Sequence, residues 1–369
     1  MIKTRTLIIG VLLGVVFLNT GTMSTFASQT ANQGLRMIEL GQVASLDDAT
    51  DVHVVDSIAY VSDMGDHATN NRIVIIDVFN PLEPQVLSEI SIPAAHTLQV
   101  VDNIAYVANG RYGLTIIDVS DPSHPCVLSS FSDGGEIYAV CVYGDFAFAG
   151  DAEEEIVEII DIQDPFNPVE VGQFQTGIPY GMDVEGDIAV IGTLSGGLLI
   201  YDVSNYSQPA LLWESEKEEE CYPDVKIIED IVYVSCYGTG FKIFNISNPT
   251  QPEELCDFQQ YEEHLSLDVV TNLVCQAVYS QGVSVINVTD ISNPVECANY
   301  YDGGKAKGID IVNDLIFVAD HSDGLEILKL TYGEETSTVV SPAFELLLVI
   351  TALVSVLVIK RKRRWRKKQ

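Results

Sequence analysis

A short apolar strand that ends in Asp or Asn recurs along this chain and constrains its fold more than any other feature. Six copies end at Asp77, Asp118, Asp161, Asp202, Asn245 and Asn287, and a seventh ends at Lys329. Successive copies follow one another at a near-constant period of about 42 residues, which is typical of repeat architectures. In such an architecture each unit buries its apolar face against its neighbours.

Each repeat resolves into four short strands. In the first copy the predicted strands are Val52–Val55, Ile58–Ser62, Ile73–Asp77 and Gln85–Ile92. The first two are joined by Asp56-Ser57, residue types that tolerate the positive φ of a tight hairpin. Proline pairs such as Pro122 and Pro125 follow the third strand, where they predict fixed turns because proline cannot donate to a strand ladder. Four antiparallel strands per repeat are typical of a propeller blade.

The two ends of the repeat region predict how the ring closes. The seventh copy stops after its third strand, at Leu330, and an extra strand, Met37–Val43, precedes the first copy. We expect that extra strand to be the fourth strand of blade seven. An open β-solenoid would leave it unexplained and would expose sheet edges. The sequence therefore predicts an all-β, seven-bladed propeller of four-stranded blades over residues 37–331.

The N-terminal residues are typical of a secretory signal peptide. Lys3 and Arg5 precede an apolar run from Leu7 to Leu18, and small residues precede a cleavage point after Ala27. The alternative is an uncleaved anchor, but twelve helical residues span only about 18 Å of a bilayer core about 30 Å thick. We expect residues 1–27 to be removed and residues 28–36 to form a short lead.

The C-terminal residues predict a membrane anchor. Residues 332–338 form a linker, and residues 339–359 are apolar with the single charge of Glu345. Such a segment is long enough for one transmembrane helix. Residues 360–369 carry eight basic side chains, which favour the cytoplasmic side. We therefore expect a single-pass protein of the cell membrane with an extracellular propeller and a cytoplasmic tail.

The charge balance excludes one class of partner. The chain has 19 basic and 53 acidic residues and a formal net charge of −34. Because such a surface repels phosphate backbones, we expect no nucleic-acid binding.

The third strand and the turn after it resemble a known family. The segment Gly113–Pro125 reads Gly-x-x-Ile-Ile-Asp-Val-Ser-Asp-Pro-x-x-Pro and is similar to the LVIVD repeat of prokaryotic cell-surface proteins. The resemblance covers about 290 residues, departs at Asn245 and Asn287, and implies a β-propeller outside a bacterial or archaeal cell, with no agreed activity. The segment from Ser341 resembles archaeal sorting tails, with Pro-Ala-Phe in place of the usual Pro-Gly-Phe.

Motifs for catalysis are missing from the sequence. It has no Gly-x-Ser-x-Gly elbow, no phosphate loop and no His-Glu-x-x-His pair. The repeated Asp/Asn column is spread around the ring, so we expect its side chains to cap turns rather than to act on one substrate atom. We predict no catalytic residues and no cofactor, with calcium as the one exception to consider.

Acidic loops between second and third strands are the candidate calcium ligands. The residues are Asp151, Glu153, Asp320 and Asp323. Carboxylate oxygens suit a hard cation, but the spacing matches no EF-hand, and a solvated run of charge is the alternative.

Two kinds of covalent modification are also predicted. Cys221 lies near the position facing Cys236 across a hairpin, which makes a disulfide a candidate, although buried thiols are the default for the seven cysteines. The sequons place candidate glycosylation sites at Asn205, Asn245 and Asn287.

A column of aromatic residues marks the candidate ligand-binding site. His96, Tyr138, Tyr180, Tyr222 and His264 follow one another at the repeat spacing, at the starts of first strands, and Lys305 and Lys307 occupy the corresponding stretch of blade seven. Since first strands are innermost in a propeller, we expect these residues to ring one mouth of the channel. Side chains with apolar area and a polar tip are common where proteins bind partners. The alternative is that they wedge between blades as core.

Three functions remain open from the sequence. The first is a membrane-anchored binding or adhesion module that takes a surface protein or a glycan. The second is an extracellular, hydrolase-like enzyme that uses the central funnel, and the third is a passive surface-layer component. Function on loops of a rigid scaffold favours the first.

Overall fold

A computed structural model of the chain describes residues 34–332, except 66–69, 195–196, 216–221, 261–262, 264 and 322. The predicted signal peptide, linker, membrane span and basic tail lie outside these residues. Within the part described, there is no helix of the length and apolar character needed to cross a bilayer.

The described residues form 28 strands in seven antiparallel sheets of four. Blades one and two contain β2 (Ala49–Val55), β3 (Ile58–Asp63), β4 (Arg72–Asp77) and β5 (Gln85–Ser91), then β6 (Leu98–Val101), β7 (Ile104–Ala108), β8 (Leu114–Asp118) and β9 (Cys126–Phe131). Blades three and four contain β10 (Ile137–Tyr143), β11 (Phe146–Asp151), β12 (Ile156–Asp161) and β13 (Val169–Gln175), then β14 (Pro179–Glu185), β15 (Ile188–Thr193), β16 (Leu198–Asp202) and β17 (Ala210–Glu214). Blades five and six contain β18 (Val225–Ile228), β19 (Ile231–Cys236), β20 (Gly240–Asn245) and β21 (Glu253–Gln259), then β22 (Ser266–Val270), β23 (Leu273–Ala277), β24 (Val283–Asn287) and β25 (Val295–Tyr300). Blade seven contains β26 (Gly308–Val312), β27 (Leu315–Asp320), β28 (Gly324–Tyr332) and β1 (Leu35–Val43).

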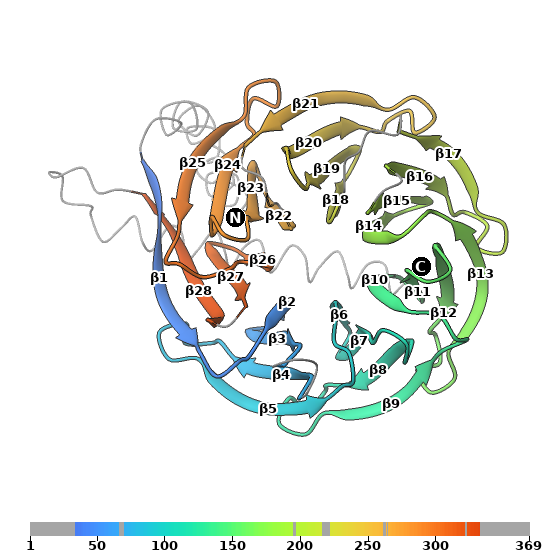
Figure 1. The fold of residues 1–369 in the computed structure, drawn as a ribbon, viewed down its shortest axis with the longest axis horizontal. Helices are drawn as coiled ribbons and strands as arrows, with labels where there is room; N and C mark the ends of the chain where they lie inside the picture. The colour runs from blue at the N-terminus through green and yellow to red at the C-terminus, as the bar shows by residue number, and fades with distance from the viewer. Residues whose placement is uncertain are drawn as a thin grey trace, which may run out of the picture. The chain divides into compact units, whose positions relative to one another are not determined.

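The seven sheets stand around a central channel, with the first strand of each blade innermost (Figure 1). The closing strand is confirmed: β1 pairs antiparallel with β28, from Leu35 opposite Tyr332 to Val43 opposite Leu325. The blade that closes the ring thus takes three strands from the end of the repeat region and one from its beginning. The propeller predicted from the repeat period is confirmed in its class, blade number and strand number.

The turn chemistry follows the sequence. Asp56 and Ser57 have φ values of 49° and 69° in the hairpin between β2 and β3. The Asp/Asn column caps the turn after the third strand in blades one to six, as predicted. For example, Asp77 Oδ1 accepts a hydrogen bond from the Phe79 N–H at 2.9 Å, and Asn245 Oδ1 accepts one from the Ser247 N–H at 2.8 Å. Because Asp and Asn accept this bond equally well, the departures from Asp leave the fold of those blades unchanged.

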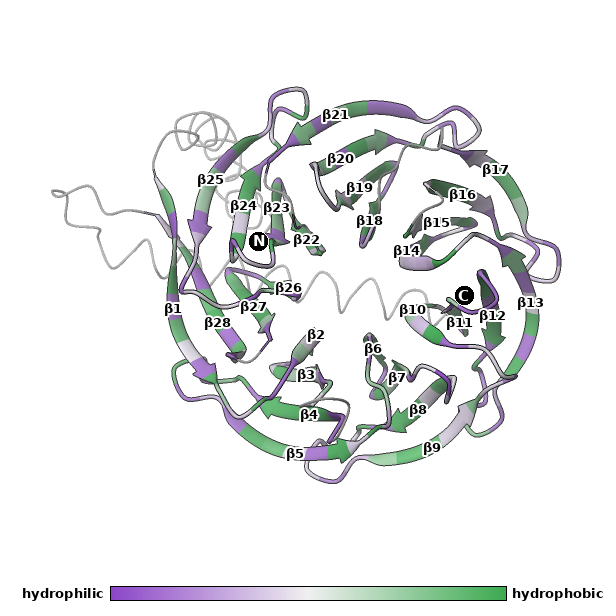
Figure 2. Ribbon diagram, viewed as in Figure 1, coloured by the Kyte–Doolittle hydropathy of each residue, from purple (hydrophilic) through white to green (hydrophobic). Residues whose placement is uncertain are grey.

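The core lies between blades rather than in one centre. Each of seven apolar clusters joins two neighbouring blades. One of them packs Val52 and Val74 of blade one against Phe317 and Ile327 of blade seven. Figure 2 shows the middle strands as mainly hydrophobic and the outer strands as mixed. The inner strands bury alternate residues in these clusters, which leaves the other half of their side chains facing the channel.

Candidate functional site

The inner strands carry two rows of side chains toward the channel. The residues of the mouth row all border one cavity, and they are Asp51, Thr97, Ala139, Gly181, Asp224, Ser266 and Gly308. Two residues further along each strand lies the inner row, which consists of His53, Gln99, Cys141, Asp183, Lys226, Asp268 and Asp310. Residues two apart on a strand share a face, so both rows line the same channel.

Carboxylates of both rows brace neighbouring blades. Asp51 Oδ2 accepts a hydrogen bond from the Leu98 N–H at 2.8 Å, and Asp224 Oδ2 accepts one from the Leu267 N–H at 2.9 Å. In the inner row, Asp268 Oδ2 accepts one from the Ile311 N–H at 3.0 Å. Inner strands are sheet edges, and these bonds satisfy N–H groups that lack a strand partner.

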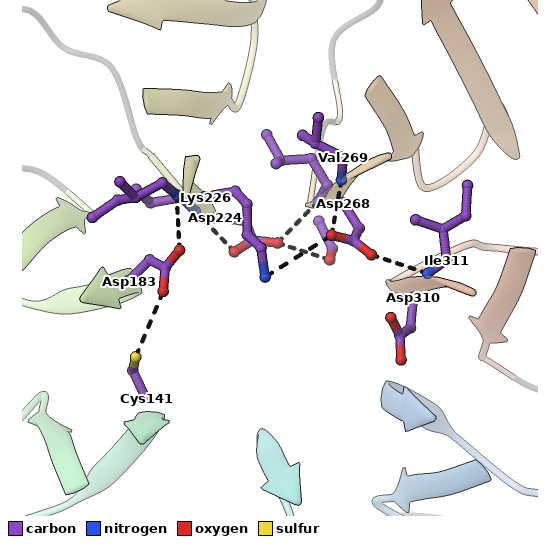
Figure 3. Close-up of polar contacts among 12 residues, drawn as sticks. Cys141, Asp183, Asp224, Lys226, Asp268, Val269, Asp310 and Ile311 are labelled. Carbon is purple, nitrogen blue, oxygen red and sulfur yellow. Dashed lines mark hydrogen bonds and ion pairs between the residues drawn. The ribbon is translucent and has the colours of Figure 1, made fainter. Parts of the chain in front are cut away.

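The same bracing crosses the closure of the ring. Asp310 Oδ2 in blade seven accepts a hydrogen bond from the Val54 N–H in blade one at 2.5 Å. Figure 3 shows that Asp183, Asp224, Lys226, Asp268 and Asp310 gather around the channel. The carboxylates therefore have a structural role that exists without any ligand.

Burial makes these carboxyl groups weak acids. It is the largest cause that raises the pKa of Asp51 to about 7 and the pKa of Asp224 and Asp268 to about 6. Lys226 Nζ lies 4.0 Å from Asp268 Oδ1. Burial disfavours the charged form of Lys226, but the carboxylates of Asp183 and Asp268 outweigh it and raise the pKa of the amine. The two rows thus contain five acids and one lysine, so a cationic ligand would supply positive charge that the rows lack.

A cavity of about 470 Å³ opens at the end of the channel where the inner strands begin. His96, Tyr138, Tyr180 and Lys307 line it together with the mouth row. The rings of His96 and Tyr138 meet edge to face with centroids 4.3 Å apart. The Tyr138 hydroxyl donates to Glu136 Oε2 at 2.9 Å. Lys307 Nζ lies 2.5 Å from Asp48 Oδ1, so its charge is compensated and the cavity stays acidic.

The structure divides the predicted mouth residues. Four of the seven line the cavity. Tyr222 does not line it, because its side chain is 3% exposed and packs with Val190 and Val225 between blades four and five. Lys305 is exposed, and its Nζ lies 5.2 Å from the centroid of the Tyr279 ring, away from the cavity lining. His264 lies outside the described residues.

The acids of the two rows were missed by the sequence analysis. Asp183, Lys226, Asp268 and Asp310 follow one another at the repeat spacing, so the repeat period contains the signal. The signal is hard to recognise because these residues lie inside the inner strands rather than at their starts. The strand register determines which residue faces the channel and which is buried. That register differs between blades, as the bulge between Ala49 and Asp51 shows.

The predicted modification sites stay predictions. Cys236 is buried, but Cys221 lies outside the described residues, so the disulfide stays a prediction. Asn205 is exposed in a turn, where its Oδ1 accepts a hydrogen bond from Ser207 Oγ at 2.9 Å. Asn245 and Asn287 use their side chains to cap turns, as described above for the whole column.

Comparisons with known proteins agree with the fold. The family model described as the LVIVD repeat matches five segments, 47–90, 94–133, 134–176, 180–214 and 223–259, which together make up more than half of the chain. No curated protein matches the sequence.

Similar solved structures show the architecture alone. A computationally designed protein, Ika8, is 14% identical with a TM-score of 0.58, over 81% of this chain and 100% of that one. BamB from Moraxella catarrhalis is 13% identical with a TM-score of 0.55, over 79% of this chain and 85% of that one.

Proposed function

Because this chain belongs to the LVIVD-repeat family, we propose that it is an interaction module whose partner enters the cavity at the mouth of the propeller channel. The observation that carries the proposal is one cavity lined by two carboxyl groups, Asp51 and Asp224, and by the rings of His96, Tyr138 and Tyr180. Its volume of about 470 Å³ is within the usual range of ligand pockets.

The chemistry of the cavity favours a positively charged group. Aromatic faces and carboxylates both attract cations. A bound cation would favour the charged form of Asp51, so binding would release the Asp51 proton to water. We propose that the occupant is a Lys or Arg side chain of another surface protein. A glycan, which also stacks on tyrosine, is the competing occupant and is one outcome of the test below.

The hydrolase-like alternative is less well supported. A catalytic carboxyl group must be free to exchange a proton with substrate. Asp51 and Asp224 instead accept backbone hydrogen bonds that hold adjacent blades together. A passive surface-layer role predicts no saturable ligand, and the same binding test separates it from the proposal.

Binding should depend on the two tyrosine rings of the cavity, half-buried Tyr138 and exposed Tyr180. The immobilised full-length chain is screened at about 150 mM salt against peptides with single Lys or Arg residues and against a glycan array. We expect saturable peptide binding. Replacing Tyr138 and Tyr180 together by Leu should weaken that binding roughly tenfold or more, because each cation–ring contact is worth about 0.5–1 kcal/mol or more.

Tyr143→Leu is the matched control, since Tyr143 is an exposed tyrosine at the far end of the same strand, β10. It should bind as the parent does. Equal affinity of the double variant and the parent would contradict the proposed site, and binding of glycans alone would replace the cationic partner by a sugar.

We further propose that the module is displayed on the outside of a prokaryotic, in particular archaeal, cell membrane. The support is the export signal at residues 1–27 and the apolar and basic segments of residues 339–369.

Protease added to intact cells tests this topology. It should degrade the propeller and spare an epitope on residues 360–369, because that tail would lie behind the membrane. Permeabilised cells should lose both. Loss of the tail epitope from intact cells would contradict the topology.

A further inference from the structure

Blades three and seven each contain a cluster of three carboxyl groups that is not part of the lining of the mouth cavity. The clusters are Asp133, Asp151 and Glu158 in blade three, and Asp302, Asp320 and Glu326 in blade seven. In each cluster one oxygen of every member lies within 4.8 Å of the others. Each cluster consists of two Asp and one Glu, and the two clusters lie four blades apart along the chain.

The strand register puts the buried pair together in both blades. Asp151 ends β11, and Glu158 lies on β12 opposite Ala149, two residues before Asp151. Glu326 on β28 lies opposite Val318, two residues before Asp320 at the end of β27. Residues two apart on a strand face the same side, so each Glu points to the side of its Asp.

A Gly-Gly loop brings the third acid to each pair. The sequences are Asp133-Gly134-Gly135 and Asp302-Gly303-Gly304. Gly134 and Gly303 have φ values of 124° and 111°, which strongly favour glycine. A Cβ on Gly135 would overlap the Asp151 carboxylate, and one on Gly304 would overlap that of Asp320. The loop backbone must therefore pass directly over the carboxylate, which sets the first Asp of the motif beside it.

Four oxygens of the buried carboxyl groups have no hydrogen-bond donor in the described residues. Glu158 is 0% exposed and neither of its oxygens has a hydrogen-bond donor there; the same holds for Asp151 Oδ2 and Glu326 Oε1. Asp151 Oδ1, by contrast, accepts the N–H groups of Glu153 and Glu154 at 2.8 and 2.9 Å. The loop thus fixes one oxygen of Asp151 and leaves the other facing the cluster. Desolvated acids without a donor are costly unless a cation accompanies them.

Two other blades place a positive charge in the corresponding position. In blade one, Asp63 is the counterpart of Asp151, and Arg72 Nε lies 2.9 Å from its Oδ2. In blade five, Lys242 is the counterpart of Glu158, three residues before the end of the third strand, and is 7% exposed. No ion pair within the described residues reaches the clusters of blades three and seven.

We propose that each cluster binds one calcium ion, held by Asp133, Asp151 and Glu158 in blade three and by Asp302, Asp320 and Glu326 in blade seven. An all-oxygen set with three carboxylates suits a hard cation. The oxygens of each cluster lie within 4.8 Å of one another, close enough for one Ca²⁺ ion with ligands about 2.3–2.6 Å away to contact all three. Mg²⁺ demands near-ideal octahedral geometry and gives up its water reluctantly, so a set of three protein carboxylates favours Ca²⁺.

The proposed sets differ from the ligand residues expected from the sequence. Asp151 and Asp320 are members, but the side chains of Glu153 and Asp323 are not. Glu153 contributes its N–H to Asp151, and the Asp323 N–H donates to the Asp320 carbonyl at 2.7 Å. The true partners come from the loop before the blade and from the third strand, not from the same loop.

Calcium titration of the chelator-stripped full-length chain tests the proposal. We expect calorimetry at about 150 mM NaCl to show two sites in the parent, one in each of Glu158→Gln and Glu326→Gln, and none in the double variant. Calcium should raise the Tm of the parent but not that of the double variant. Gln has nearly the same shape as Glu and cannot ionise in the buried site, so the metal-free variants should fold at least as stably as the parent.

Glu153→Gln and Asp323→Asn are matched controls that each remove one carboxyl group from the loop just before the same strand. Both should keep two sites. Two sites in the double variant, or no saturable binding by the parent, would overturn the proposal, since binding would then come from the acidic surface in general. Equal or tighter binding of Mg²⁺ would overturn the assignment to calcium.

Discussion

Deleting residues 28–44 should turn a soluble propeller into an aggregating one. The deletion removes β1, which covers β28 along its whole length from Leu325 to Tyr332. A bare outer edge of nine residues is a template for pairing with another chain. The blade also loses Met37 and Val43 from the clusters that join it to blades six and one. Since a domain is stable by only about 5–15 kcal/mol, we expect loss of most of the cooperative unfolding transition.

Size-exclusion chromatography and denaturant unfolding measure this result. The control deletion removes residues 28–33, which lie before β1, and should leave both the elution volume and the unfolding midpoint unchanged. A chain without residues 28–44 that is monomeric and unfolds as cooperatively as the parent would show that β1 is not needed to close the ring.

The fold was accessible from the sequence because each blade is encoded locally. Hairpin turns such as Asp102-Asn103, with φ values of 50° and 67°, set two strand boundaries in each repeat, and Pro pairs set two more in four of the seven repeats. Closure followed from counting strands, since an extra strand at one end matched a missing strand at the other. Both inferences follow from the repeat pattern, and neither requires knowledge of a contact between residues far apart in the sequence.

The sites were less accessible because they depend on exceptions to the repeat. A repeat period draws attention to columns that recur in every blade, whereas within the described residues the carboxylate clusters occur in two of the seven blades. Glu158 replaces an ordinary strand residue, such as Val74 in blade one, and its partner Asp133 lies before the first strand of the same blade. The Asp-Gly-Gly motif, which recurs four repeats later, was the available signal.

Unfolding free energy should fall as the pH rises from about 4 to 7. Burial, above all, raises the pKa of Asp51 to about 7 and the pKa of Asp224 and Asp268 to about 6, from about 3.8 in the unfolded chain. The folded chain therefore holds protons in this window that the unfolded chain has lost. The stabilisation from each acid is complete below pH 3.8 and disappears as the pH passes the folded pKa.

His53 acts in the opposite direction. Burial, with a smaller effect of Lys226, lowers its pKa from 6.5 to about 4, so its contribution increases as the pH rises through that interval. Three acids outweigh one histidine, and each group contributes at most about 1.4 kcal/mol per pH unit. The pKa of Glu158 and Glu326 rises to about 9, mainly by burial, so the decline continues above pH 7 when calcium is chelated.

Asp51→Asn tests the largest of these shifts with the inter-blade bond kept, because an amide oxygen can still accept from the Leu98 N–H. Denaturant unfolding at pH 4 to 8 with chelator should give a flatter slope than the parent and, at pH 8, a chain more stable by at least about 1 kcal/mol. Asp118→Asn removes the same charge from an exposed turn, where hydrogen bonds from Ser120 lower the pKa of Asp118, so its slope over this range should match the parent's. A parental slope in Asp51→Asn, or stability that rises from pH 4 to 7 in the parent, would mean that the channel carboxylates are ionised and matched by positive charge in the folded chain.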